Sequence, residues 1–143
     1  MYDSIPVFHP EHRAPPVLRV GYEGSSKSHT RRSNAGSRTL RRAVAFIEAN
    51  LGERFSLELL ANHAGVSRFH LARQFRQATG FSPMEYLMRQ RIERGKRILA
   101  RGDVSICEVA VALGFCDQSH FTRRFRRMTG QTPREYVRRC INN

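Results

Sequence analysis

The chain has 143 residues, enough for one modest domain or two very small ones. It carries 25 lysines and arginines against 12 acidic residues, a formal net charge of +13, and all but two of the basic residues are arginines. This excess favours a polyanionic partner. Three separated cysteines, no signal-peptide pattern and no long apolar run argue against a disulfide-stapled secreted domain and a membrane-spanning protein. We therefore expect a cytoplasmic protein without membrane contacts.

Residues 1–37 show no sustained hydrophobic periodicity. Four prolines interrupt the first half of this segment, and small and polar residues fill positions 24–37. Such a composition is typical of linkers and disordered segments. We expect residues 1–37 to form a flexible N-terminal tail.

The next part of the chain predicts three helices. Apolar residues recur there at three- and four-residue spacing, and serines stand at the expected starts of the second and third helices. The expected ranges are Ser37 or Thr39 to Leu51, Ser56 to His63, and 67–79.

The third of these helices is expected to face both a core and a ligand. Leu71 and Phe75 lie at i and i+4, so they share a buried face, while the remaining positions are rich in arginine and contain no acidic residue. Ser67 can cap the helix, and Gly80 can end it in a left-handed conformation. A helix, a tight turn at Gly65 and a second helix with a basic outer face are the outline of a helix-turn-helix.

A long helix is predicted over residues 83–100. Ser82-Pro83-Met84-Glu85 matches a capping box with proline in the first helical position. Gly95 in the interior costs about 0.5–1 kcal/mol relative to alanine, which indicates a close contact with another helix. Arg91 is expected among the basic side chains that cover the rest of this helix.

The pattern of the first three helices then returns. A capping box at Ser105 opens a helix through Leu113, Asp117 caps a basic helix over 117–129, and a short helix follows from Thr132 to about Cys140. The offset between the copies is forty-nine residues before the turn and fifty after it, so the second turn is one residue longer. Two copies of one unit predict a tandem DNA reader, and no part of them shows a strand pattern.

The second copy also carries a specific motif. Residues 112–136 contain G-F-x-D-x-S-x-F-x-R-x-F, followed by G-x-T-P-x-x-Y. This motif resembles the AraC/XylS family of bacterial transcription regulators, and the resemblance extends over about residues 38–140. It implies an all-α fold of about seven helices, with two homeodomain-like helix-turn-helix subdomains joined by a linker helix. The expected divisions are a tail at 1–37, a first subdomain at 38–82, the linker at 83–100 and a second subdomain at 101–143.

The resemblance further implies that helices 67–79 and 117–129 enter adjacent major-groove segments of double-stranded DNA. By analogy with single-domain members of the family, base edges would be read by Phe69, Ala72, Arg73, Gln118, Ser119, Thr122 and Arg123. Arginine suits guanine, glutamine suits adenine, and apolar side chains suit the thymine methyl group. Phosphate contacts are expected from Arg68, Arg76, Arg124, Arg126 and Arg127.

The function expected on this basis is that of a sequence-specific transcription regulator associated with the nucleoid. Because activation is the commoner mode in the family, we expect an activator. We expect a monomer on DNA that contacts RNA polymerase and needs no cofactor, metal or small-molecule ligand. The short tail favours a stand-alone regulator. The alternative is a detached C-terminal DNA-binding module of a ligand-sensing relative.

The sequence offers little support for two other functional classes, an enzyme and a module that binds only protein. Cys107, Cys116 and His120 do not follow zinc-site spacing, and Cys107 is expected to be buried, so an alkyl-transfer enzyme is disfavoured and no catalytic residue is assigned. A protein-interaction module is also disfavoured, because binding to protein alone would not require two helices with basic outer faces. His70 and His120 occupy equivalent positions, and packing against the core is the preferred role for both.

Overall fold

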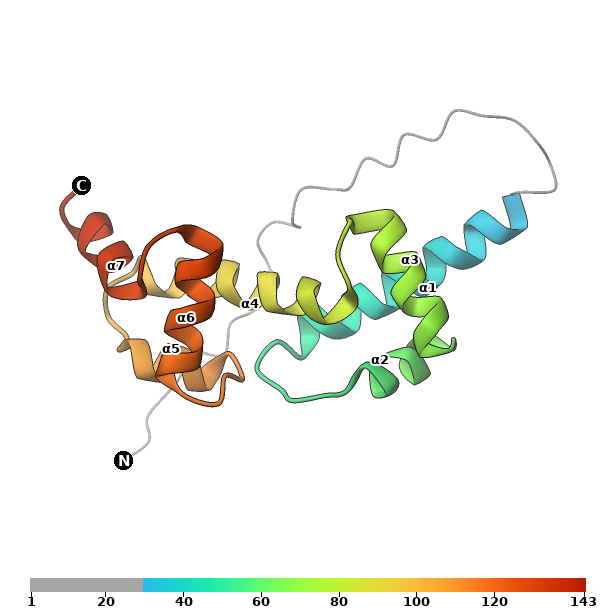
Figure 1. The fold of residues 1–143 in the computed structure, drawn as a ribbon, viewed down its shortest axis with the longest axis horizontal. Helices are drawn as coiled ribbons and strands as arrows, with labels where there is room; N and C mark the ends of the chain where they lie inside the picture. Colours follow the sequence, from blue (N-terminus) through green and yellow to red (C-terminus); the bar gives the residue numbers. More distant parts are fainter. Residues whose placement is uncertain (1–29) are drawn as a thin grey trace.

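The computed structural model describes residues 30–143, and over these residues the chain forms helices joined by short loops, without a strand (Figure 1). The all-α prediction is confirmed. The expected tail falls largely on residues 1–29, which lie outside the described residues. The helices are α1 (Thr30–Ala49), α2 (Leu57–Ala64), α3 (Arg68–Thr79), α4 (Pro83–Leu99), α5 (Ile106–Ala112), α6 (Gln118–Thr129) and α7 (Pro133–Ile141).

The first helix begins earlier than the sequence predicted. α1 starts at Thr30, so residues 30–37, which were assigned to the tail, are helical. This extension lies against α3, because a Cβ added to Gly36 would be 2.9 Å from Nε2 of Gln74. A polar segment of this kind has no apolar periodicity from which a helix could be predicted.

The helix starts follow the predicted caps. Ser56, Ser67, Ser82, Ser105, Asp117 and Thr132 each accept a hydrogen bond from the backbone N–H three residues further on. The predicted box at Ser82 lacks its return bond, since Glu85 lies 3.6 Å from a guanidinium nitrogen of Arg89 instead.

Complete capping boxes form at α5 and α7. Glu108 accepts from the backbone N–H of Ser105 at 2.9 Å, and Glu135 accepts from that of Thr132 at 2.8 Å. These backbone bonds, with help from the hydroxyl groups, lower the pKa of both carboxyl groups. Both boxes are therefore intact at neutral pH, and their contribution to stability is lost as the pH falls through the lowered pKa values.

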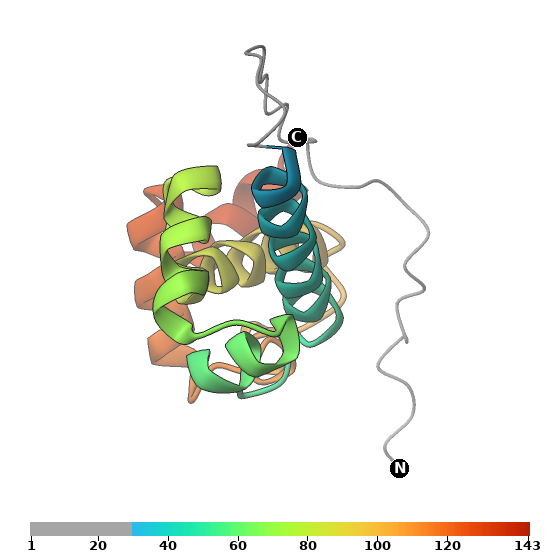
Figure 2. The same ribbon diagram turned by 90° about the vertical axis from the view of Figure 1, so that its right-hand side faces the viewer.

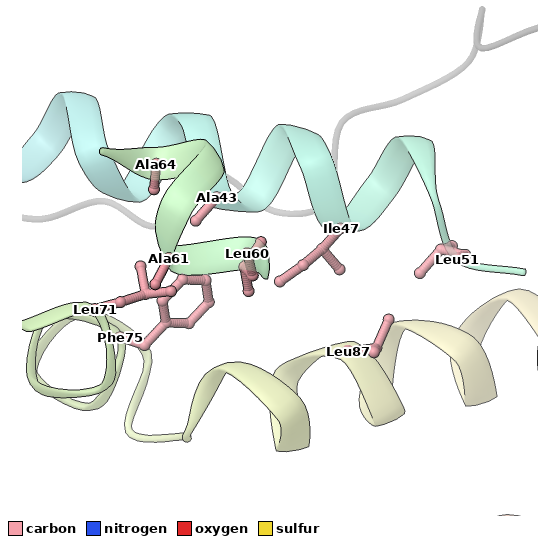
Figure 3. Close-up of a cluster of buried hydrophobic side chains, with 9 residues drawn as sticks. All are labelled: Ala43, Ile47, Leu51, Leu60, Ala61, Ala64, Leu71, Phe75 and Leu87. Atoms are coloured by element: carbon pink, nitrogen blue, oxygen red, sulfur yellow. The ribbon is translucent and has the colours of Figure 1, made fainter. Parts of the chain in front are cut away.

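Side chains of α4 contribute to two hydrophobic cores. In the first core, side chains from α1, α2 and α3 point towards Leu87 of α4 (Figure 3). In the second, Ile92 and Leu99 of the same helix pack with residues of α5 and α6, including Phe121 and Phe125. α4 is therefore part of both units. Among residues 30–143, none of the helices has the length and apolar character needed to cross a bilayer.

Gly95 makes the close contact that its position in α4 predicted. A Cβ at this residue would lie 3.2 Å from Cδ1 of Leu113 and 3.2 Å from two ring carbons of Phe121. The ring of Phe121 is fully buried and also packs on Phe115 and Phe125, with ring centres 5.1 and 5.5 Å away. Glycine thus lets α4 approach α6 where a side chain would have to displace a packed ring.

Replacing Gly95 by valine should therefore lower the free energy of unfolding by about 1–3 kcal/mol, as expected for overpacking a filled core. Urea denaturation measures this change. Arg97→Val is the matched control, because it puts the same residue on the exposed face of the same helix. It should cost no more than about 0.5 kcal/mol. Equal losses in the two variants would mean that the contact at Gly95 is unimportant.

Candidate nucleic-acid interface

α3 and α6 lie on the same side of the molecule and run in the same direction, as both views show (Figures 1 and 2). Each has 12 residues. Ser67 Oγ accepts a hydrogen bond from the backbone of His70 at 3.2 Å, and Asp117 Oδ1 accepts one from that of His120 at 2.7 Å. The two helices therefore begin with the same local geometry.

One face of each helix is fixed in a core. Leu71 and Phe75 of α3 are fully buried, as are Phe121 and Phe125 of α6. This is the inner face that the i, i+4 spacing predicted. The opposite face of each helix is consequently held outwards by packing beneath it.

The turns that precede α3 and α6 share a glycine in the left-handed conformation. Gly65 and Gly114 both have φ +76°, and the residue after each donates a backbone hydrogen bond to a carbonyl of the preceding helix, at 3.1 and 3.0 Å. The second turn then contains the additional residue Cys116 before the cap. The helix-turn-helix geometry is thus repeated with one insertion.

The two histidines at equivalent positions of the repeat, His70 and His120, have different surroundings. The ring of His120 packs edge-on against Phe115 at 5.2 Å between ring centres, so its predicted packing role is confirmed. His70 is exposed, and the prediction is wrong there. The first turn has Val66 where the second has Phe115, so His70 lacks the equivalent of the ring that His120 packs against.

The residues predicted to read bases have side chains on or near the outer faces. Phe69 is 73% exposed, and the guanidinium carbon of Arg68 lies 5.1 Å from its ring centre. Ala72 and Thr122 are half-buried. The other exposed members of the set are Arg73, Gln118, Ser119 and Arg123. Within the described residues, the ring of Phe69 thus remains mostly exposed, as an apolar surface at the start of a helix.

The arginines predicted to contact phosphate are also exposed. They are Arg68, Arg76, Arg124, Arg126 and Arg127. Within residues 35–143, none of these five forms an ion pair with an acidic side chain. Among these residues, their guanidinium groups are therefore exposed to solvent without a paired carboxylate, although Arg126 is near enough to Glu135 to help lower the pKa of that carboxyl group.

Two expectations about other side chains were wrong. Arg91, expected on the outer surface of α4, is 7% exposed, and burial lowers the pKa of its guanidinium, with a smaller effect from Arg54. Cys107, expected to be buried, is exposed because it lies in the first turn of α5. Across the described residues, no three His, Cys, Asp or Glu side chains are grouped as a metal site.

Comparisons with known proteins agree with this geometry. A family model described as "Helix-turn-helix domain" matches residues 60–139. The transcriptional activator RhaS of Escherichia fergusonii is 36% identical over 80 residues, which are 56% of this chain and 29% of that protein. The chain thus spans less than a third of the length of this curated relative.

Solved structures of other proteins share this helical fold. An AraC-type transcriptional regulator from Chromobacterium violaceum aligns with a TM-score of 0.69 and 36% identity, over 75% of this chain and 96% of that one. The DNA-binding domain of AdpA, solved in complex with a target DNA, aligns with a TM-score of 0.65 and 37% identity, over 69% and 89% of the two chains.

Proposed function

Because this chain belongs to the AraC-type helix-turn-helix family of transcription regulators, we propose that it binds specific double-stranded DNA sequences with α3 and α6 in adjacent major-groove segments. The observation that carries the proposal is the repetition of one helix geometry on one side of the molecule, with a buried inner face and an exposed basic outer face in both copies. Two such helices read two blocks about one helical turn apart.

Base recognition is assigned to the outer faces near the N-termini of these helices. Arg73 and Arg123 each offer a forked donor that suits O6 and N7 of guanine, and Gln118 suits adenine. Phe69 and Ala72 offer apolar contacts to a thymine methyl group. Ser119 and Thr122 complete the set as short hydroxyl side chains.

Phosphate contacts are assigned to the five exposed arginines Arg68, Arg76, Arg124, Arg126 and Arg127. Such contacts fix the register of a protein on the duplex and add affinity, but carry no sequence information. Their exposure supports this assignment, as does the lack of ion pairs with acidic side chains within residues 35–143.

We take the regulator to be an activator that binds DNA as a monomer and contacts RNA polymerase. RhaS is named as an activator, which supports the direction of regulation. Two reading helices in one chain supply a paired site without a second protomer. No small-molecule ligand and no catalytic step form part of the proposal.

A second candidate is that these residues are the DNA-binding module of a longer, ligand-sensing regulator. It is favoured by the alignment with only 29% of the length of RhaS. An immunoblot of the native host separates the two: a stand-alone regulator migrates near 16.5 kDa, and a module of a longer protein migrates well above it.

Selection of binding sites from a random duplex pool tests the main proposal, using purified protein at near-physiological salt. We expect two enriched blocks with their centres about ten base pairs apart. Enrichment of a single block would mean that one helix reads sequence while the other only anchors on phosphate. Salt-sensitive binding without enrichment would contradict sequence-specific recognition.

Two single substitutions separate the proposed roles of the arginines. Arg123→Ala should cost roughly 1–3 kcal/mol of binding free energy on the selected site and relax the preference at one base pair. Arg76→Ala should weaken binding to all sequences alike and flatten the salt slope by about one unit. Titrations against the selected site and its single-base variants measure both effects. Identical profiles for the two variants would contradict the assigned roles.

A further inference from the structure

The loop after α1 and the C-terminal end of α5, which belong to different helix-turn-helix units, approach each other through their backbones. A Cβ added to Gly52, in the loop after α1, would lie 2.5 Å from the carbonyl oxygen of Ala112 at the end of α5. A Cβ on Gly114 would in turn lie 2.9 Å from the carbonyl oxygen of Gly52. The two helix-turn-helix units therefore touch backbone to backbone, at a distance that leaves no room for a methyl group.

Arg91 of α4 lies beside this contact and binds both segments. Its Nε donates to the carbonyl of Leu51 and its Nη2 to that of Glu53, each at 2.7 Å. Its Nη1 reaches the carbonyl of Gly114 at 3.5 Å, and the guanidinium carbon lies 5.9 Å from the ring centre of Phe115. One buried side chain thus connects the loop after α1 with the turn before α6.

The partners of Arg91 explain how a positive charge is tolerated there. The carbonyls of Leu51 and Glu53 follow the C-terminus of α1, and that of Gly114 follows the C-terminus of α5. Helix C-termini carry partial negative charge and carbonyls that lack partners within the helix. The rigid fork of a guanidinium can bond several carbonyls at once, which a lysine ammonium does less well.

This connection lies to one side of the axis of α4, because the side chain of Arg91 reaches out from that helix to the two loops. A helix shared by two cores sets the distance and the rotation between them, and a second contact away from its axis limits bending and twisting of one unit relative to the other. Arg91 and the Gly52–Ala112 approach supply that second contact. It includes Gly114, three residues before Asp117, the residue that caps α6.

We propose that Arg91 is a positioning residue that holds α3 and α6 in a fixed relative orientation and thereby sets the number of base pairs between the two DNA blocks. The inference rests on the proposed function, since it concerns the spacing of a paired site. Each added base pair moves the second block by ~3.4 Å and turns it by about 34°. A rigidly joined pair of helices cannot follow such a shift, whereas a loosely joined pair can.

The test uses the duplex selected by the wild-type protein, together with versions that have one base pair inserted or deleted between the blocks. In the wild type, either change should weaken binding about tenfold or more, because the second helix loses at least one bidentate base contact. In Arg91→Met the penalty should shrink to about threefold or less, since a loosely tethered reader tolerates a displaced block. Arg91→Lys, which retains the charge, should be intermediate.

A second variant reaches the same contact without removing a charge. Gly52→Ala places a methyl group against the carbonyl of Ala112, so it should shift the two units apart and change the spacing preference as well. If circular dichroism shows that Arg91→Met does not fold, Gly52→Ala decides the question by the same measurement. Arg97→Met, on the exposed face of α4, is the control for loss of charge and should leave the ratio between spacings unchanged.

The outcomes separate this inference from the function on which it rests. If the wild type selects no paired site, the proposed function fails first. If it selects one, and a folded Arg91→Met and Gly52→Ala both keep the wild-type spacing penalty, the positioning role is wrong. Equal weakening at every spacing in both variants would likewise overturn it, because that pattern indicates only a loss of stability or charge.

Discussion

Phe125→Ala should lower the free energy of unfolding by about 3–5 kcal/mol, the range for removal of a fully buried phenylalanine. The side chain is 0% exposed, and its ring centre lies 5.5 Å from those of both Phe121 and Tyr136. Truncation leaves a cavity under α6, between that helix and α7. Chemical denaturation followed by circular dichroism measures the loss.

The matched control for Phe125→Ala is the same substitution at Phe69. That side chain is also on a helix of the candidate interface but is 73% exposed, so its removal should change stability by no more than about 0.5 kcal/mol. Phe69→Ala should instead alter the base preference at one position of the selected site. Similar unfolding midpoints for the two variants would contradict the assignment of one face to the core and the other to DNA.

DNA binding should be strongly salt-dependent. If the five proposed arginines neutralise five phosphates, the slope of log K against log salt is about −4.5, at ~0.9 per phosphate. Raising the salt from about 50 to about 200 mM should then weaken binding roughly 500-fold. Fluorescence anisotropy with a labelled duplex at several salt concentrations gives the slope.

A duplex of unrelated sequence serves as the comparison for the salt experiment. It should bind more weakly, with a slope of similar steepness, because phosphate contacts do not depend on sequence. A slope of only about −1 for the selected site would mean that most of these arginines do not reach the DNA backbone. The assignment of the phosphate set would then be wrong, even if base recognition were retained.

Much of the fold follows from local signals in the sequence. The caps at Ser67 and Asp117, the left-handed glycines and the buried i, i+4 pairs are set by residues close to one another in the chain, so pattern alone predicts them. Gly95 could also be interpreted correctly, because a glycine inside a long helix has an energetic cost that a close contact explains. The repeat supplied a second, independent copy of the same signals.

The features that the sequence did not predict depend on contacts between distant segments. Arg91 has the same residue type as its exposed neighbours on α4, and only the meeting of two helix ends around it makes its burial favourable. The early start of α1 has no apolar periodicity to predict it, and its described part lies close to α3 at Gly36 and Gln74. His70 and His120 have equivalent positions in the repeat, but one extra turn residue and the change from valine to phenylalanine give them different surroundings.

The sharing of α4 by both cores also restricts how this protein can evolve. Each residue of an α-helix advances the chain by ~1.5 Å and turns it by about 100°. A single insertion between Leu87 and Ile92 would rotate one core away from the helix face that completes it, and would swing α6 out of line with α3. On the proposed function, new target sequences would be reached through substitutions on the exposed faces of α3 and α6, whereas a change in the length of α4 would remove the paired site in one step.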